Sequence, residues 1–158
     1  RFVFVVAFRL LANEEDARDV VQETFVRVWK HLHSFQAQKS FTTWLYKIIT
    51  NLCYDTLRNA YNRRTYNSIE NENLTPLLKT TVALEEHVCN SELAEKICEL
   101  ANGLKSRQHM VFVLRDLQDL DMQEIAEILN ISVSAVKSNL YYARVNIRKK
   151  MKKMKYVS

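Results

Sequence analysis

Residues that form tight turns are almost absent from this chain. Its 158 residues include a single glycine, Gly103, and a single proline, Pro76, while hydrophobic residues make up 47%. Hairpins and phosphate-binding loops depend on glycine, because its backbone adopts positive φ angles without strain. A chain of this composition is therefore expected to be all-α, and a sheet-based fold is disfavoured.

Three helices are predicted in the N-terminal part. The first covers residues 2–12, Asn13 is placed to cap a second helix with an acidic first turn, and Ser40 is placed to cap a third. The apolar stripe predicted for the second helix is Ala17, Val20, Val21, Thr24, Phe25, Val28 and Leu32. The buried face predicted for the third is Phe41, Leu45, Ile48, Ile49 and Leu52, opposite Thr43, Lys47, Thr50, Tyr54, Arg58 and Tyr61.

The helical period disappears between Tyr61 and Thr81, where asparagines and Pro76 replace it. Such a segment is typical of a linker. We therefore expect two small helical domains over residues 1–66 and 92–158, each with a marginal core, joined by a flexible linker over residues 67–91. Because the chain opens with Arg1 inside an apolar helical segment, an N-terminal piece is expected to precede it.

A helix-turn-helix is predicted after Leu120. Asp121 and Glu124 suit a capping box for its first helix, Asn130 suits a left-handed turn, and Ser132 is placed to cap its second helix. The predicted inward residues are Met122, Ile125, Ala126, Leu129, Val136, Leu140, Ala143 and Ile147. The outer face of the second helix carries Ser134, Lys137, Ser138, Tyr141 and Arg148, with Tyr142 at its edge and Arg144 following it toward the DNA backbone. A plain helical hairpin needs no such cationic face, so binding in the major groove of DNA is favoured.

Aromatic and cationic side chains also gather on the third helix. Rings stack on unpaired bases while cations hold the backbone, so the pattern favours single-stranded or melting DNA, although Trp44 suits a core position equally well. The set is Trp44, Lys47, Tyr54, Arg58, Arg63 and Arg64. The second helix instead carries an acidic face of Asp16, Asp19, Gln22 and Glu23. Charge alone leaves that face as either a solvated surface or a docking surface for a protein.

Other classes of protein are disfavoured. No apolar run approaches the roughly 18 residues of a membrane span, so membrane insertion is not expected. Cys53, Cys89 and Cys98 are odd in number and lack the spacing of a zinc site, so buried reduced thiols are expected, and neither a metal nor another cofactor. With no glycine loop for phosphate and no facing set of carboxylates, an enzyme such as a helical nucleotide hydrolase is not expected.

Three segments together resemble the extracytoplasmic-function (ECF) sigma factors, the two-domain branch of the sigma-70 family. "EEDARDVVQETFVRVWKHLHSF" is similar to their region 2, "SFTTWLYKIITNLCYDTLR" to the adjacent promoter-melting segment, and "VFVLRDLQDLDMQEIAEILNISVSAVKSNLYYARVNIRKK" to region 4. The order of the three makes the resemblance specific, and it covers nearly the whole chain apart from the linker.

The resemblance implies a non-enzymatic factor that directs core RNA polymerase to promoters. It implies that the acidic face docks on core polymerase, that the third-helix set contacts and melts minus-ten DNA, and that "HSFQAQKSF" captures a flipped base. The outer face of the helix-turn-helix would read minus-thirty-five DNA. An anti-sigma factor is an expected partner, and the cytoplasm is the expected location. The alternative is a helix-turn-helix regulator that does not itself melt promoters.

The chain departs from the family pattern at several positions. The family often has Leu-Pro at Leu104-Lys105, glycine at Asn130 and near Ser134, and arginine or histidine around Asn139 and Tyr142. These departures bear on which promoter sequence is read, and they leave the expected fold unchanged.

Overall fold

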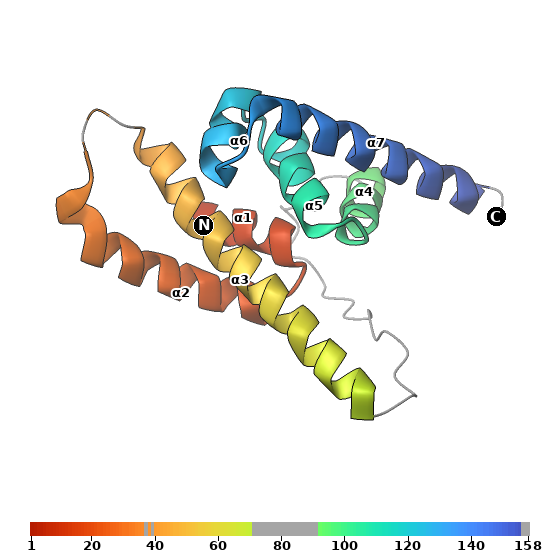
Figure 1. Ribbon diagram of the computed structural model, residues 1–158, viewed down its shortest axis with the longest axis horizontal. Coiled ribbons are helices and arrows are strands. Elements are labelled where there is room, and N and C mark those ends of the chain that lie inside the picture. The colour runs from red at the N-terminus through yellow and green to blue at the C-terminus, as the bar shows by residue number, and fades with distance from the viewer. Residues whose placement is uncertain (37, 39, 71–91, 156–158) are drawn as a thin grey trace.

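The computed structural model describes residues 1–36, 38, 40–70 and 92–155, with the side chains of residues 61–70, 92–95 and 155 left out. Helices are the only regular elements in this described part (Figure 1). Those of the first half are α1 (Phe2–Leu11), α2 (Glu14–His31), the short 3₁₀-helix η1 (Leu32–Ser34) and α3 (Phe41–Glu70). Those of the second half are α4 (Glu92–Asn102), α5 (Ser106–Phe112), the π-helical turn η2 (Val113–Leu117), α6 (Met122–Leu129) and α7 (Val133–Lys155).

The predicted caps of the first half are confirmed. The side chain of Asn13 accepts a hydrogen bond of 2.9 Å from the backbone N–H of Asp16, which fixes the start of α2. Ser40 Oγ accepts one of 3.3 Å from the N–H of Thr43 in the first turn of α3. Since each cap satisfies an amide that has no partner within its helix, these polar residues define where the helices begin.

The helix-turn-helix is confirmed as well. Asp121 and Glu124 form a reciprocal capping box at the start of α6, and Asn130 ends that helix with φ 51° and ψ 51°. Ser132 Oγ accepts a hydrogen bond of 3.1 Å from the N–H of Ala135 and so caps α7. Asparagine tolerates the left-handed region better than most residues, which allows the sharp turn without glycine.

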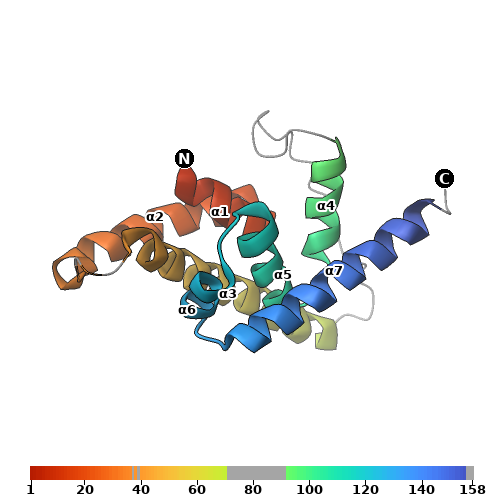
Figure 2. The same cartoon turned by 90° about the horizontal axis from the view of Figure 1, so that it is seen from above.

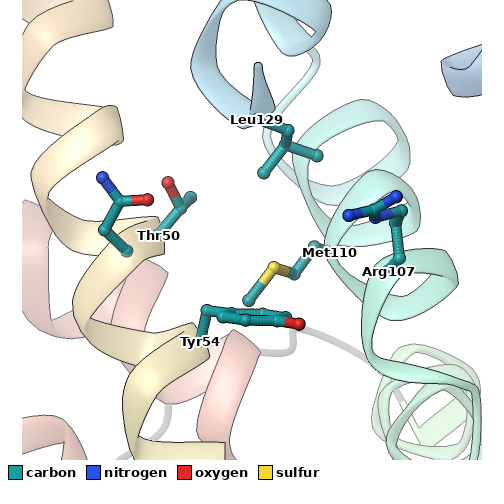
Figure 3. A pocket seen from close by; sticks show the side chains of 6 residues that line it. Thr50, Tyr54, Arg107, Met110 and Leu129 are labelled. Carbon is teal, nitrogen blue, oxygen red and sulfur yellow. The ribbon is translucent and has the colours of Figure 1, made fainter. Parts of the chain in front are cut away.

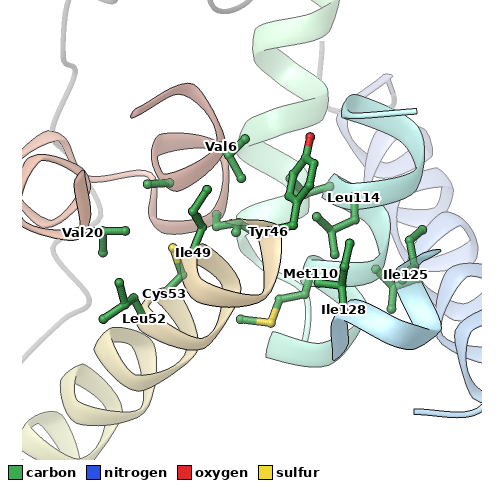
Figure 4. Close-up of a cluster of buried hydrophobic side chains, with 14 of the residues drawn as sticks. Val6, Val20, Tyr46, Ile49, Leu52, Cys53, Met110, Leu114, Ile125 and Ile128 are labelled. Carbon is green, nitrogen blue, oxygen red and sulfur yellow. The ribbon is translucent and has the colours of Figure 1, made fainter. Parts of the chain in front are cut away.

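The two halves share one apolar core, which the sequence did not predict. Val6 of α1, Ile49 of α3, Leu114 of η2 and Ile125 of α6 are all 0% exposed within a single cluster (Figure 4). A smaller cluster of Ala101, Phe112, Ala143 and Ile147 joins α4, α5 and α7. Figures 1 and 2 show α5 and α6 between α3 and the long α7. The two halves were expected to have separate marginal cores, but the larger cluster is shared between them and only the smaller one belongs to the second half alone.

Polar contacts also join the halves. The guanidinium of Arg9 in α1 donates a hydrogen bond of 2.7 Å to the carbonyl oxygen of Leu117. The hydroxyl of Tyr46 in α3 donates one of 3.1 Å to the side-chain oxygen of Gln118. Because Tyr46 is only 3% exposed, this bond satisfies a hydroxyl that would otherwise be buried without a partner.

The burial predicted for α2 and α3 is wrong at several positions. Phe25, Leu32 and Phe41 were expected inside but are exposed, whereas Thr43 and Thr50 were expected outside but are buried. The reason on α3 is that the helix packs on two sides, against α1 and α2 and against α5 and α6. Thr50 tolerates this burial because its hydroxyl donates to the backbone oxygen of Tyr46 at 2.8 Å.

The expected boundary at residue 66 lies inside α3, which continues to Glu70. Most of the predicted linker, residues 71–91, lies outside the described residues, and the domain limits stay a prediction. None of the described helices is long and apolar enough to cross a membrane.

Candidate nucleic-acid interface

The predicted recognition face of α7 is open to solvent. Its buried stripe is Val136, Leu140, Ala143 and Ile147, as predicted. The opposite residues Ser134, Lys137, Ser138 and Arg148 are exposed. Tyr141 and Tyr142 are 65% and 56% exposed, and their rings meet edge to face with centroids 5.5 Å apart. Folding alone does not account for two neighbouring exposed tyrosines, so this face is suited to apolar and hydrogen-bonding contacts with a partner.

Arg144 is held within the protein. Its Nε and Nη2 donate hydrogen bonds of 3.0 and 2.6 Å to the two carboxylate oxygens of Asp116 in η2. The hydrogen bonds to Asp116 raise the pKa of Arg144 above its usual range. Arg148, one turn further along, has no ion pair with any residue in the described ranges. The two arginines predicted for DNA contact are therefore not equivalent, because only Arg148 presents an uncompensated charge.

The acidic residues of α2 do share an open face. Asp19, Gln22 and Glu23 are exposed and Asp16 is half-buried near the helix start. Glu23 accepts a hydrogen bond of 3.0 Å from Nε of Arg27, four residues along the helix. This surface pair leaves the net acidic character of the first two turns unchanged.

The same face continues into apolar residues that sequence reasoning missed. Val26 is 44% exposed and Trp29 is 84% exposed. Each lies seven residues beyond an acidic-face member, Asp19 and Gln22 respectively, and seven residues return almost to the same side of a helix. The spacing could therefore have shown that the acidic face and these two residues form one surface.

The six residues predicted for minus-ten DNA are distributed among different environments. Trp44 is half-buried, with its ring centroid 5.2 Å from that of Phe35 and 5.6 Å from that of Phe41. This aromatic cluster joins the two ends of the α2–α3 connection, so Trp44 is partly structural. Arg58 is exposed and lies 3.7 Å from a carboxylate oxygen of Asp55. Arg63 and Arg64 belong to α3, but their side chains lie outside the described residues.

Lys47 and Tyr54 face the second half of the chain. Nζ of Lys47 lies 2.9 Å from a carboxylate oxygen of Glu127 in α6. Tyr54 is 40% exposed and forms one wall of a pocket of about 190 Å³ between α3, α5 and α6 (Figure 3). The residues that line the pocket are Thr50, Asn51, Tyr54, Arg107, Met110 and Leu129. Sequence reasoning missed Arg107, because nothing in its local pattern places it beside α3.

The buried cysteine Cys53 is not placed to react. Burial raises the pKa of the Cys53 thiol to about 12, so this cysteine stays protonated and unreactive, as predicted. Cys89 lies outside the described residues. Within the described ranges, no group of three His, Cys, Asp or Glu side chains could hold a metal ion.

His109 lies between the halves and is 4% exposed. Its Nδ1 is 2.8 Å from the carbonyl oxygen of Ala101, near the end of α4, and its Nε2 is 3.2 Å from that of Arg9, near the end of α1. Burial lowers the pKa of His109, while its hydrogen bonds to the backbone carbonyls oppose the shift. The folded chain therefore favours the neutral ring, which carries one N–H for two facing oxygens.

Comparison with known proteins gives the class of the chain. The family model described as sigma-70 region 2 matches residues 1–64, and the model described as sigma-70, region 4 matches residues 94–147. Both regions occur in the order expected of sigma-70-type initiation factors. The match to region 2 does not support the alternative of a regulator built on a helix-turn-helix alone.

Individual relatives identify the branch of the sigma-70 family to which the chain belongs. The ECF RNA polymerase sigma factor SigW of Bacillus subtilis is 33% identical over 156 residues, which covers 95% of this chain and 83% of the relative. The ECF RNA polymerase sigma-E factor of Haemophilus influenzae is 30% identical over 88% of this chain and 76% of its own length. The chain therefore belongs to the ECF sigma factors of the sigma-70 family, and it is a non-enzymatic factor for the initiation of transcription.

Solved structures support the fold. The sigma factor RpoE from Bartonella quintana, solved with the anti-sigma factor NepR, superposes with a TM-score of 0.71 at 20% identity over 96% of this chain and 90% of that one. CnrH, solved with the cytosolic domain of CnrY, gives a TM-score of 0.68 at 24% identity over 96% of this chain and 81% of that one. At these identities the likeness concerns the fold alone.

Proposed function

We propose that this ECF sigma factor uses three surfaces, one for docking on core RNA polymerase and two for recognising the promoter. The exposed face of α2 docks on core RNA polymerase, the α3 residues contact and melt the minus-ten DNA, and the outer face of α7 reads the minus-thirty-five DNA. The two DNA contacts, those of α3 and α7, are each weak but reinforce each other, because the second becomes intramolecular once the first has formed.

The observation that carries the docking proposal is the composition of the α2 face. An 84% exposed tryptophan, Trp29, lies on the same side of the helix as Asp19 and Gln22. Exposed tryptophan is strongly enriched at protein interfaces and unfavourable in water. The acidic residues beside it would repel DNA, so the partner of this face is a protein with a basic or neutral surface.

The docking proposal is tested by charge reversal. The double variant Asp19→Lys with Glu23→Lys is expected to lose binding to core polymerase in a pull-down, with its circular dichroism spectrum and unfolding midpoint close to those of the wild type. Glu99→Lys is the matched control, because Glu99 is also an exposed carboxylate paired with a cation on its own helix, but it lies on α4. Unchanged core binding by the double variant would show that α2 is not the docking surface.

Melting is assigned to two exposed side chains of α3, Tyr54 and Arg58. Tyr54→Ala with Arg58→Ala is expected to reduce promoter opening more than polymerase binding, since the two side chains would stack on and hold the separated strand. Permanganate footprinting of thymines in the minus-ten region measures the opening directly. Normal footprints with normal polymerase binding would contradict this assignment.

We also propose an anti-sigma factor as a partner and the cytoplasm as the location. The first proposal is supported by the likeness to the sigma factor RpoE, which was solved with the anti-sigma factor NepR. The second is supported by family membership, since a factor that acts on RNA polymerase works where the chromosome lies. Affinity purification of the tagged chain from cell fractions tests both proposals together.

A further inference from the structure

The C-terminal end of α7 extends beyond the part of the chain that the family model matches. The match to region 4 ends at residue 147, whereas α7 continues without interruption to Lys155. Figures 1 and 2 show this end of the helix projecting past α4. The α7 extension, residues 148–155, is rich in lysine, and α7 contains no acidic residue along its length. The extension therefore carries positive charge that the matched region does not account for.

One side of the α7 extension is seated on α4. Met151 packs against the smaller apolar cluster, which joins α4, α5 and α7. Nζ of Lys150 donates a hydrogen bond of 3.4 Å to the carbonyl oxygen of Leu100, near the C-terminal end of α4, where the helix dipole favours a cation. A β-carbon at Gly103, the single glycine of the chain, would clash with that ammonium group. These contacts fix which side of the extension faces the protein and which side faces solvent.

The solvent side of the extension continues the recognition face of α7. Lys152 lies eleven residues beyond Tyr141, and eleven residues advance a helix by three turns and only about 20°. Arg148 lies between them on the same side, and both cations are exposed. Neither has an ion pair with any side chain that the structure describes. Lys153, by contrast, is turned about 120° away from Tyr141.

The length of α7 places Lys152 outside the major groove. Recognition helices contact base edges with their N-terminal residues, which in α7 include Lys137. Lys152 follows Lys137 by 15 residues, which is about 22 Å along a helix, whereas the major groove is only about 12 Å wide. When Lys137 lies at base edges, Lys152 therefore lies beyond the groove, where the phosphates of the DNA backbone run.

We propose that the α7 extension is a second DNA-binding surface, in which Lys152, together with Arg148, binds phosphates of duplex DNA beside the minus-thirty-five element. The inference rests on the minus-thirty-five role given to α7 under the proposed function. Because phosphates carry no sequence information, the extension adds affinity for every duplex alike and leaves the preference among sequences to the first turns of α7. Its seat on α4 holds it in line with the recognition face, so little ordering is needed when DNA binds.

Ethylation interference tests the contact at single phosphates. Holoenzyme is reconstituted from the full chain and core polymerase and bound to a promoter fragment from which it makes a run-off transcript. Ethylation of phosphates beside the minus-thirty-five element is expected to interfere with binding of the wild type, and about one or two of these positions are expected to tolerate ethylation in Lys152→Gln. An unchanged interference pattern in Lys152→Gln would overturn the proposal.

The neighbouring lysine supplies a matched control. Lys153→Gln removes the same charge from an exposed side chain on another side of the helix. Lys152→Gln is expected to lower the affinity of holoenzyme about threefold to fivefold for the promoter fragment and for an unrelated duplex alike, the effect of one exposed ion pair. Lys153→Gln is expected to lower it less than about twofold, since this lysine points away from the DNA. Equal losses in the two variants would show that only the overall charge of the helix matters, which also contradicts the proposal.

The outcomes separate this inference from the proposed function. Interference at phosphates within the minus-thirty-five element supports the reading role of α7, whatever happens at Lys152. If that interference is present but Lys152→Gln and Lys153→Gln behave alike, the inference alone fails. If it is absent, the minus-thirty-five role of α7 is contradicted and the inference fails with it. If Lys152→Gln instead weakens the pull-down of core polymerase, the extension contacts the polymerase and the inference is wrong.

Discussion

Replacing Ile125 by alanine tests whether the two halves fold as one unit. Ile125 lies in α6, is 0% exposed, and belongs to the cluster that also contains Val6 of α1 and Ile49 of α3. Truncating a fully buried isoleucine removes its transfer free energy and leaves a cavity, which together cost about 2–5 kcal/mol. With a urea dependence of about 2 kcal/mol per molar, a loss of about 3 kcal/mol lowers the unfolding midpoint by about 1.5 M.

The two tryptophans of the chain report on unfolding of the first half, whereas Ile125 lies in the second half. Both tryptophans, Trp29 and Trp44, lie in the first half, and Trp44 is half-buried against Phe35 and Phe41. Tryptophan fluorescence therefore follows unfolding around α2 and α3, whereas far-ultraviolet circular dichroism follows all helices. We expect Ile125→Ala to lower both midpoints by the same amount, because the cavity lies in a shared core.

The exposed apolar residue Met154 provides the control. It lies in the same half of the chain but is 39% exposed, so Met154→Ala is expected to change the free energy of unfolding by less than about 0.5 kcal/mol. If Ile125→Ala lowers only the circular dichroism midpoint and leaves the fluorescence midpoint in place, the two halves unfold separately and the reasoning from a shared core is refuted.

Other predictions follow from single contacts. Burial lowers the pKa of His109 below its ordinary 6.5, so the unfolded chain takes up a proton at a higher pH than the folded chain does. The free energy of unfolding should therefore fall as the pH drops from about 7 to about 5. Urea midpoints measured across this range should fall less in the variant His109→Gln. Asp121→Ala removes the capping box and should lower the free energy of unfolding by about 1 kcal/mol in thermal or urea melts. Lys137→Ala should cost about 1–3 kcal/mol and relax preference at one or two minus-thirty-five positions, whereas Arg148→Ala should weaken binding to every sequence alike; fluorescence anisotropy on promoter variants would contradict both if the two profiles were the same.

Local features of the fold were predictable from the sequence. Asn13, Ser40, Asp121 and Ser132 each cap the helix that they were expected to cap, because a cap depends on residues within one turn of itself. The outer face of α7 was also predictable, because that helix packs on one side only and its apolar stripe, from Val136 to Ile147, follows the helical period.

The shared core was not predictable in the same way. Lys47 and Glu127 are 80 residues apart in sequence, and no local pattern indicates that their helices meet. On α3 the second packing surface includes Tyr46 and the threonines Thr43 and Thr50, which periodicity assigns to solvent because they are polar. The two threonines are buried because other helices cover this side of α3, and the hydroxyl of Thr50 bonds within its own helix. Only the hydroxyl of Tyr46 depends on a partner that the tertiary structure supplies, Gln118.

The exposed face of α2 shows a second reason why part of the candidate site was not predicted from the sequence. The acidic residues were predicted to form a surface because charged side chains are rarely buried. Trp29 was not predicted to belong to it, because an apolar residue in an amphipathic helix is ordinarily assigned to the core. The stripe instead follows Ala17, Val20 and Thr24, and Phe25 lies a further 100° or so around the helix, outside the packed side.

The pairing of Arg144 with Asp116 bears on how many counterions leave the DNA when α7 binds. Each cation that neutralises a phosphate releases roughly one condensed counterion, and this release makes binding sensitive to salt. A guanidinium whose two hydrogen bonds already end on a carboxylate brings no net charge unless that pair opens. The recognition helix should therefore release fewer counterions than its basic residues would indicate by number, and its grip on a promoter should persist better as the ionic strength of the cell rises.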